Sequence, residues 1–92
     1  MKIQEKQDVI IKGFEYVNLS NIRVPMIAIY NGPDDFPDKY VARLYNMNVA
    51  TNIIMVEDDI EKIRENIRKN YITMVPLPKS KLDVKSLVET WF

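Results

Sequence analysis

The reactive side chains of this sequence are restricted to carboxylates, tyrosines, lysines and arginines, because histidine and cysteine are both absent. Histidine is the side chain whose ordinary pKa lies nearest neutrality, and the Ser-His-Asp and Cys-His catalytic arrangements depend on it. Zinc sites are usually built from the same two residue types. We therefore expect no catalytic residue, no metal site and no enzymatic activity.

Acidic residues are concentrated in two places. Asp34, Asp35 and Asp38 lie in the turn-rich segment NGPDDFPD, without the spacing of an EF-hand. This segment is interpreted as a solvated loop, with contact to a cation or a partner protein as the alternative. The acids between residues 57 and 61 are explained by the start of a helix.

Nucleotide phosphates need glycine-rich loops whose backbone amides can approach them closely. The sequence has two glycines, Gly13 and Gly32, and neither lies in a GxGxxG or P-loop pattern. No cofactor is therefore expected.

Nucleic acid is a candidate partner on local grounds alone. Basic and acidic residues number 13 each and the pI is about 6.2, so the chain supplies no overall excess of positive charge. Tyr40, Arg43 and Tyr45 lie on one predicted strand, where tyrosine could stack on bases and arginine could contact phosphate. The predicted helix adds four basic residues: Lys62, Arg64, Arg68 and Lys69. The alternative interpretation is a half-buried sheet face with arginine reaching to solvent. RNA or single-stranded nucleic-acid binding is thus the second hypothesis.

A protein partner is the first hypothesis, and it rests on aromatic side chains. Phe36 is flanked by prolines and acids in a predicted loop, and Trp91 and Phe92 end the last predicted strand. Aromatic residues on a rigid loop or an edge strand make good anchors, and an edge strand can extend a partner's sheet. The opposing interpretation is that the last two residues close the core. The predicted partner-binding residues are Phe36, Tyr40, Arg43, Tyr45, Trp91 and Phe92.

One amphipathic helix and a small sheet must position these side chains. Isoleucines recur at intervals of three and four residues: Ile60, Ile63 and Ile67. This pattern predicts a helix over residues 59–69 with one apolar face. Asp58 is predicted to cap the helix in a capping box with Glu61, and Asn70 to end it in the left-handed conformation. The charged outer face is interpreted as solvated.

Runs of β-branched and aromatic residues predict the strands. A central strand is predicted over residues 24–30, and a hairpin over 39–47 and 52–56. Two further strands are predicted over 71–75 and 84–92, separated by the segment PLPKSKLD, whose two prolines should break any regular element. Neither face of the last strand is cleanly apolar, so which face is buried stays open.

The fold class follows from the order of these elements. Residues 9–19 predict one bent strand or two short ones, since Gly13 favours a bend. The resulting order ββββαββ predicts an α+β fold: a mostly antiparallel sheet of about five to six strands with one helix packed on one face. A length of 92 residues fits a single domain. The sequence shows no signal peptide and no apolar run of membrane-spanning length, so a cytoplasmic location is expected.

The segments KYVARLY, NIIMVEDDIEKIREN and VETWF resemble small uncharacterised proteins of Firmicutes and their phages or mobile elements. The resemblance covers about residues 26–92, and the residues that carry it are Tyr40, Val41, Ala42, Arg43, Glu89 and Trp91. It implies no assigned activity and no functional residue. The expected function is a non-enzymatic protein-interaction module of the phage or mobile-element type. Such a module could associate with itself or regulate a host protein.

Overall fold

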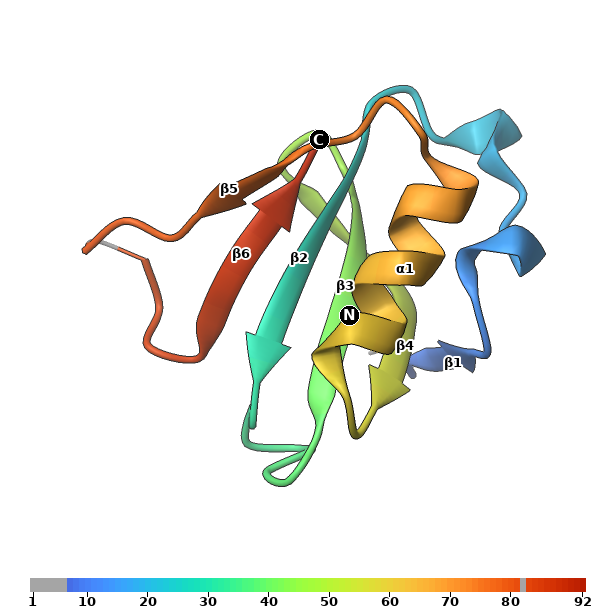
Figure 1. Cartoon of the computed structure of the whole chain (residues 1–92). Helices are drawn as coiled ribbons and strands as arrows, with labels where there is room; N and C mark the ends of the chain where they lie inside the picture. Colours follow the sequence, from blue (N-terminus) through green and yellow to red (C-terminus); the bar gives the residue numbers. More distant parts are fainter. Residues whose placement is uncertain (1–6, 82) are drawn as a thin grey trace, which may run out of the picture.

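The fold is a six-stranded sheet with one helix across one face (Figure 1). The computed structural model describes residues 7–81 and 83–92. The strands follow the spatial order β1-β4-β3-β2-β6-β5. The elements are β1 Val9–Ile11, β2 Pro25–Asn31, β3 Tyr40–Asn46, β4 Val49–Glu57, α1 Ile60–Asn70, β5 Pro76–Pro78 and β6 Leu87–Trp91. The predicted α+β class and the order ββββαββ are therefore confirmed.

The sheet is mixed because one edge pair runs parallel. β2 pairs antiparallel with both β3 and β6, which confirms the predicted central strand, and β3 pairs antiparallel with β4. β1 pairs parallel with β4. The segment after β1 bends at Lys12, one residue before the expected position, and passes through an extended Gly13 into two 3-10 turns, Phe14–Tyr16 and Leu19–Asn21, so the second short strand allowed by the sequence does not form there.

The β3–β4 hairpin is tighter than the sequence predicts. β4 begins at Val49 rather than residue 52, and only Met47 and Asn48 connect the two strands. Met47 has a φ of 55°, in the left-handed region that two-residue hairpin turns require. The residue with positive φ is a methionine rather than the glycine or asparagine that usually marks such a turn. Composition therefore did not indicate the turn, and the start of β4 was predicted too late in the sequence.

Both ends of α1 differ from the prediction, although its apolar face is confirmed by the burial of Ile63 and Ile67. The cap is Asp59, whose carboxylate accepts a hydrogen bond from the amide of Glu61 at 2.9 Å. Asp58 instead forms an ion pair with Lys39, so the predicted capping box is wrong. Asn70 is the last helical residue and does not have a positive φ.

The core lies between α1 and the sheet. Its buried members come from every central element: Phe14, Ile27, Ile29, Ala42, Leu44, Met55, Ile63, Ile67 and Trp91. Each buried isoleucine contributes roughly 1.5–3 kcal/mol through removal of apolar surface from water. Because successive side chains of a strand point to opposite faces of the sheet, every second residue packs against the helix and the residues between them lie on the other face.

The C-terminal strands correct two expectations. Residues 71–75 form a turn, and the strand lies instead over Pro76–Pro78, within the segment expected to be irregular. Val75 and Phe92 exchange both backbone hydrogen bonds, at 3.1 and 3.2 Å, so the nitrogens of Pro76 and Pro78 point away from β6. Proline is tolerated in a sheet at such an edge because no donor is needed there.

Candidate functional site

The sheet face opposite α1 carries most of the side chains with potential for recognition. Register and strand alternation place on it Met26, Ala28, Tyr30, Val41, Arg43, Tyr45, Leu77 and Thr90. We call this surface the open face, because the one helix of the described residues lies on the other side of the sheet (Figure 1). No helix among the described residues has the length and apolarity needed to cross a membrane.

The predicted site residues are divided between the two faces of the sheet. Arg43 and Tyr45 lie together on the open face. Tyr40 lies on the helix side, partly buried against the core, and Trp91 is a core residue with 2% exposure. Phe92, which is 48% exposed, follows Thr90 at the far end of the open face, and Phe36 is half-buried in the β2–β3 connection. The six residues therefore do not form one surface.

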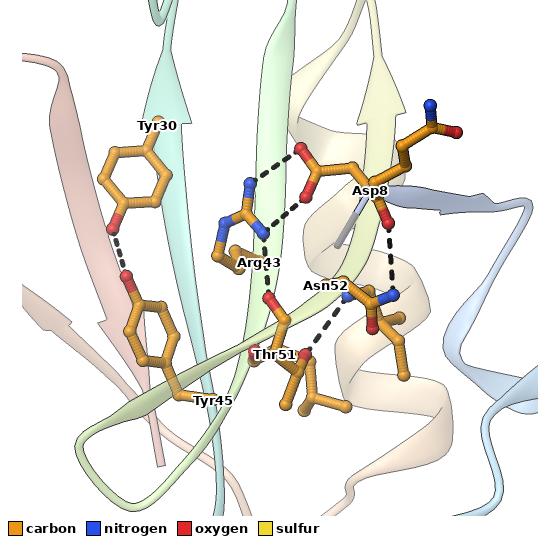
Figure 2. Close-up of polar contacts among 9 residues, drawn as sticks. Asp8, Tyr30, Arg43, Tyr45, Thr51 and Asn52 are labelled. Carbon is orange, nitrogen blue, oxygen red and sulfur yellow. Dashed lines mark hydrogen bonds and ion pairs between the residues drawn. The ribbon is translucent and has the colours of Figure 1, made fainter. Parts of the chain in front are cut away.

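Tyr30 and Tyr45 share a hydrogen bond between their hydroxyls at 2.8 Å (Figure 2). Tyr30 is paired with Val41 in the register and Tyr45 with Met26, so the two rings reach toward each other along neighbouring strands. Burial, followed by the hydrogen bond to Tyr45, raises the pKa of Tyr30 well above its usual range. Tyr30 is thus neutral under ordinary conditions, and the pair forms a rigid, half-buried polar surface.

Arg43 is held by Asp8 in a two-bond ion pair, at 2.9 and 3.0 Å, and also donates to the carbonyl of Thr51 at 2.8 Å (Figure 2). The hydrogen bonds from Arg43 lower the pKa of Asp8, and those same bonds raise the pKa of Arg43. Asp8 therefore neutralises the charge that the nucleic-acid hypothesis needs for phosphate. Asn52 donates to the carbonyl of Gln7 at 3.1 Å and fixes the same segment to β4.

A cleft of about 900 Å³ opens at one end of the open face. Its floor includes the apolar side chains of Val41 and Val88 together with Tyr30, and Arg43 also lines it. One wall is the β2–β3 connection with Asp34 and Asp35, and the other is the β5–β6 connection with Lys79, Val84 and Lys85. The Lys79 ammonium donates a hydrogen bond to the carbonyl of Lys85 at 2.9 Å, within the second wall. The cleft is therefore lined by acidic residues from one connection, basic residues from the other and apolar residues between them.

The sequence pointed to only part of this cleft. The acids of the first wall were recognised as a loop cluster, with a partner contact as one alternative. The second wall was missed for two reasons: Lys79 belongs to the segment expected to be irregular, and Val84 and Lys85 were assigned to the last strand, which begins only at Leu87. The signal that could have been used is the group of three lysines, Lys79, Lys81 and Lys85, with Asp83 as the one acid among them.

The buried carboxylate of Glu89 lies on the helix side of the sheet, where its hydrogen bonds hold the fold together. It accepts two hydrogen bonds from Arg64, at 3.1 and 2.7 Å, and one from the indole of Trp91 at 2.7 Å. Burial alone would raise the pKa of Glu89, but these bonds and the charges of Arg64 and Arg68 outweigh it and lower the pKa. A general acid needs the opposite shift. The described residues contain no group of three or more acidic side chains placed to hold a metal.

Comparison of the chain with protein-family models, with curated proteins and with solved structures finds no match. The resemblance to proteins of Firmicutes and their mobile elements stays a prediction. Function must accordingly be argued from the open face and its cleft.

Proposed function

We propose that this chain is a non-enzymatic protein-binding module that engages its partner through the open face. The observation that carries the proposal is the cleft, where apolar side chains lie together with acidic residues of the β2–β3 connection and basic residues of the β5–β6 connection. Protein interfaces combine an apolar centre with a polar rim, and rim charges select the partner. A protein surface with both signs of charge complements such a rim.

Exposed apolar side chains extend the same face beyond the cleft. Leu77 and Phe92 are 47% and 48% exposed, and Val75 beside Phe92 is also exposed. Strand alternation puts these residues on the side of Thr90, away from α1. Apolar side chains that gather on one face, rather than singly, are typical of interaction surfaces.

Nucleic acid is less well supported by the same surface. The basic side chain at the centre of the face, Arg43, is paired with Asp8, and Asp34 and Asp35 would repel phosphate at the cleft. Tyr30 and Tyr45 use their hydroxyls on each other. Salt-dependent binding of a mixed oligonucleotide pool would nevertheless replace the protein proposal, because that signal requires phosphate contacts.

The test is quantitative capture by four immobilised forms of the full chain, from a cell lysate to which the soluble full chain, carrying its own tag, has been added. Wild type is compared with Leu77→Glu and Phe92→Glu on the open face, and with Tyr16→Glu as the matched control. Tyr16 is an exposed apolar residue, at 69%, in the 3-10 turn before the core. We expect captured proteins that are retained by the control and lost with both open-face variants. Equal capture by all four forms would refute the proposal.

A further inference from the structure

We infer that the partner of the open face is a second copy of this chain, bound by reciprocal docking of the β5–β6 connection into the cleft. The inference rests on the proposed function, since it names the occupant of the same face. It is carried by the opposite charges of the two walls and by the exposed valine on the basic wall.

The two connections that frame the cleft carry opposite charge. The β2–β3 connection holds Asp34, Asp35 and Asp38, and its one lysine, Lys39, is already paired with Asp58, which lies between β4 and α1. The described part of the β5–β6 connection holds Lys79, Lys81 and Lys85 against Asp83. A basic segment and an acidic segment on one surface are what an isologous interface needs, because a twofold axis brings each segment of one copy against the other segment of its partner.

Asp83 is the one acid among the lysines of the β5–β6 connection, but its carboxylate is engaged within the connection. Its carboxylate accepts a hydrogen bond from the amide of Ser80 at 2.7 Å and so shapes its own loop. Lys79 is likewise directed to the carbonyl of Lys85. The described residues of the β5–β6 connection are therefore bonded to one another, and Lys79 and Lys85 among them line the cleft.

Val84 supplies the apolar contact. It is 61% exposed although it lies beside an apolar floor formed by Tyr30, Val41 and Val88. Insertion into the cleft of a second copy would remove Val84 from water and cover that floor. Reciprocal insertion repeats this burial twice, once for each copy.

Charge and area set the expected strength. The chain has no net charge, so two copies do not repel each other over long range. Six strands spaced about 4.8 Å apart make a face roughly 24 Å wide, and a seven-residue strand such as β2 or β3 is roughly 23 Å long, whereas β1 and β5 have three residues each. The area that each copy can cover is therefore below the roughly 800 Å² per partner of a standard interface. We therefore expect a reversible, concentration-dependent dimer rather than an obligate one.

The test is sedimentation velocity of the full chain, with paired charge reversals. Asp34→Lys with Asp35→Lys makes both walls basic, and Lys79→Glu with Lys85→Glu makes both walls acidic. Each variant alone should dimerise at least about tenfold more weakly than wild type, and an equimolar mixture should regain a dimer of one copy of each. Raised salt should weaken the wild-type dimer. Recovery on mixing also shows that both variants are folded.

Two results would overturn the inference. One is a wild-type chain that sediments as a monomer up to millimolar concentration. The other is a dimer that neither reversal weakens. Lysate capture that still depends on Leu77 and Phe92 would then leave the proposed function standing with a different protein as partner, whereas loss of that dependence would remove both.

Discussion

The guanidinium of Arg64 on α1 binds the carboxylate of Glu89 on β6 through two hydrogen bonds, at 3.1 and 2.7 Å, across the helix–sheet interface. The Glu89 side chain is only 11% exposed, and Arg64 is 27% exposed. The same carboxylate accepts from Trp91, while Arg68 lies over the indole at 5.5 Å. One buried carboxylate thus joins the helix, strand β6 and the core tryptophan.

Removing that charge should destabilise the fold. Glu89→Gln removes the carboxylate that Arg64 binds on the sheet side and leaves Arg64 with Glu61 of its own helix, at 2.7 Å, as its remaining ion-pair partner. We therefore expect a loss of about 1.5–3 kcal/mol in the free energy of unfolding. Urea denaturation followed by tryptophan fluorescence measures it. Glu65→Gln, on the exposed side of the same helix, is the control and should change the free energy by less than about 0.5 kcal/mol. Equal effects of the two substitutions would contradict this role for Glu89.

The same pair predicts a direction for pH dependence. The pKa of Glu89 is lowered in the folded protein from its ordinary value of 4.5. The stabilisation from Glu89 is therefore fully present above pH 4.5 and is lost as the pH falls through the folded pKa. Acid titration of the unfolding free energy should show a shallower fall in Glu89→Gln than in wild type. Parallel curves would show that Glu89 does not contribute.

The turn between β3 and β4 should be stabilised by glycine. Met47 has a φ of 55°, a conformation that costs an L-residue about 1–2 kcal/mol and glycine almost nothing. Met47 is also 54% exposed, so little packing is lost. We expect Met47→Gly to raise the free energy of unfolding by about 1 kcal/mol. Asn48→Gly, at the neighbouring position without a positive φ, should give no gain, and thermal unfolding compares the two.

The backbone conformation of the β2–β3 connection, which forms the acidic wall of the cleft, should require glycine at position 32. This residue has a φ of 62°, and a Cβ added to it would lie 2.7 Å from the carbonyl oxygen of Pro37. Gly32→Ala is therefore expected to cost at least about 1–2 kcal/mol, from backbone strain and from the contact. Asn31→Ala, one residue earlier in an exposed position, is the matched control. A Gly32→Ala protein as stable as that control would contradict the strain.

Two tyrosines should respond oppositely to loss of the hydroxyl. The Tyr71 hydroxyl is buried and has no hydrogen-bond partner in the described structure, and burial raises its pKa. Tyr71→Phe should be neutral or stabilising by up to about 1 kcal/mol, because an unsatisfied polar group is removed. Tyr45→Phe breaks the hydrogen bond with Tyr30 and should destabilise by about 1 kcal/mol. Chemical denaturation of both variants tests the contrast.

The elements with strong periodicity could be predicted from the sequence. Ile63 and Ile67 repeat with the helical period, and residues 24–30 form a continuous apolar run, so α1 and the central strand β2 were located within two residues. The capping residue was misplaced by one position, because Asp58 and Asp59 are both suitable caps. The choice depends on Lys39, which is distant in sequence and binds Asp58.

The strand at Pro76 to Pro78 could not be predicted from local propensity. Proline argues against a strand unless the strand is an edge, and edge position is a property of the whole sheet. Of the basic wall, Lys79 fell in the segment expected to be irregular, and Lys85 was assigned to the last strand, which begins only at Leu87. Arg43 was identified as a surface residue, but its pairing with Asp8 joins positions 35 residues apart and has no local signal.

The two outward-facing prolines of β5 limit how copies of this chain can assemble. An added strand would need amide donors along that edge, and Pro76 and Pro78 present none. Lateral growth by strand addition, which propagates without limit and ends in fibrils, is therefore blocked at this end of the sheet. Association through a face, in contrast, is complete once that face is covered. The chain is thus built for finite particles and against polymerisation from its β5 edge.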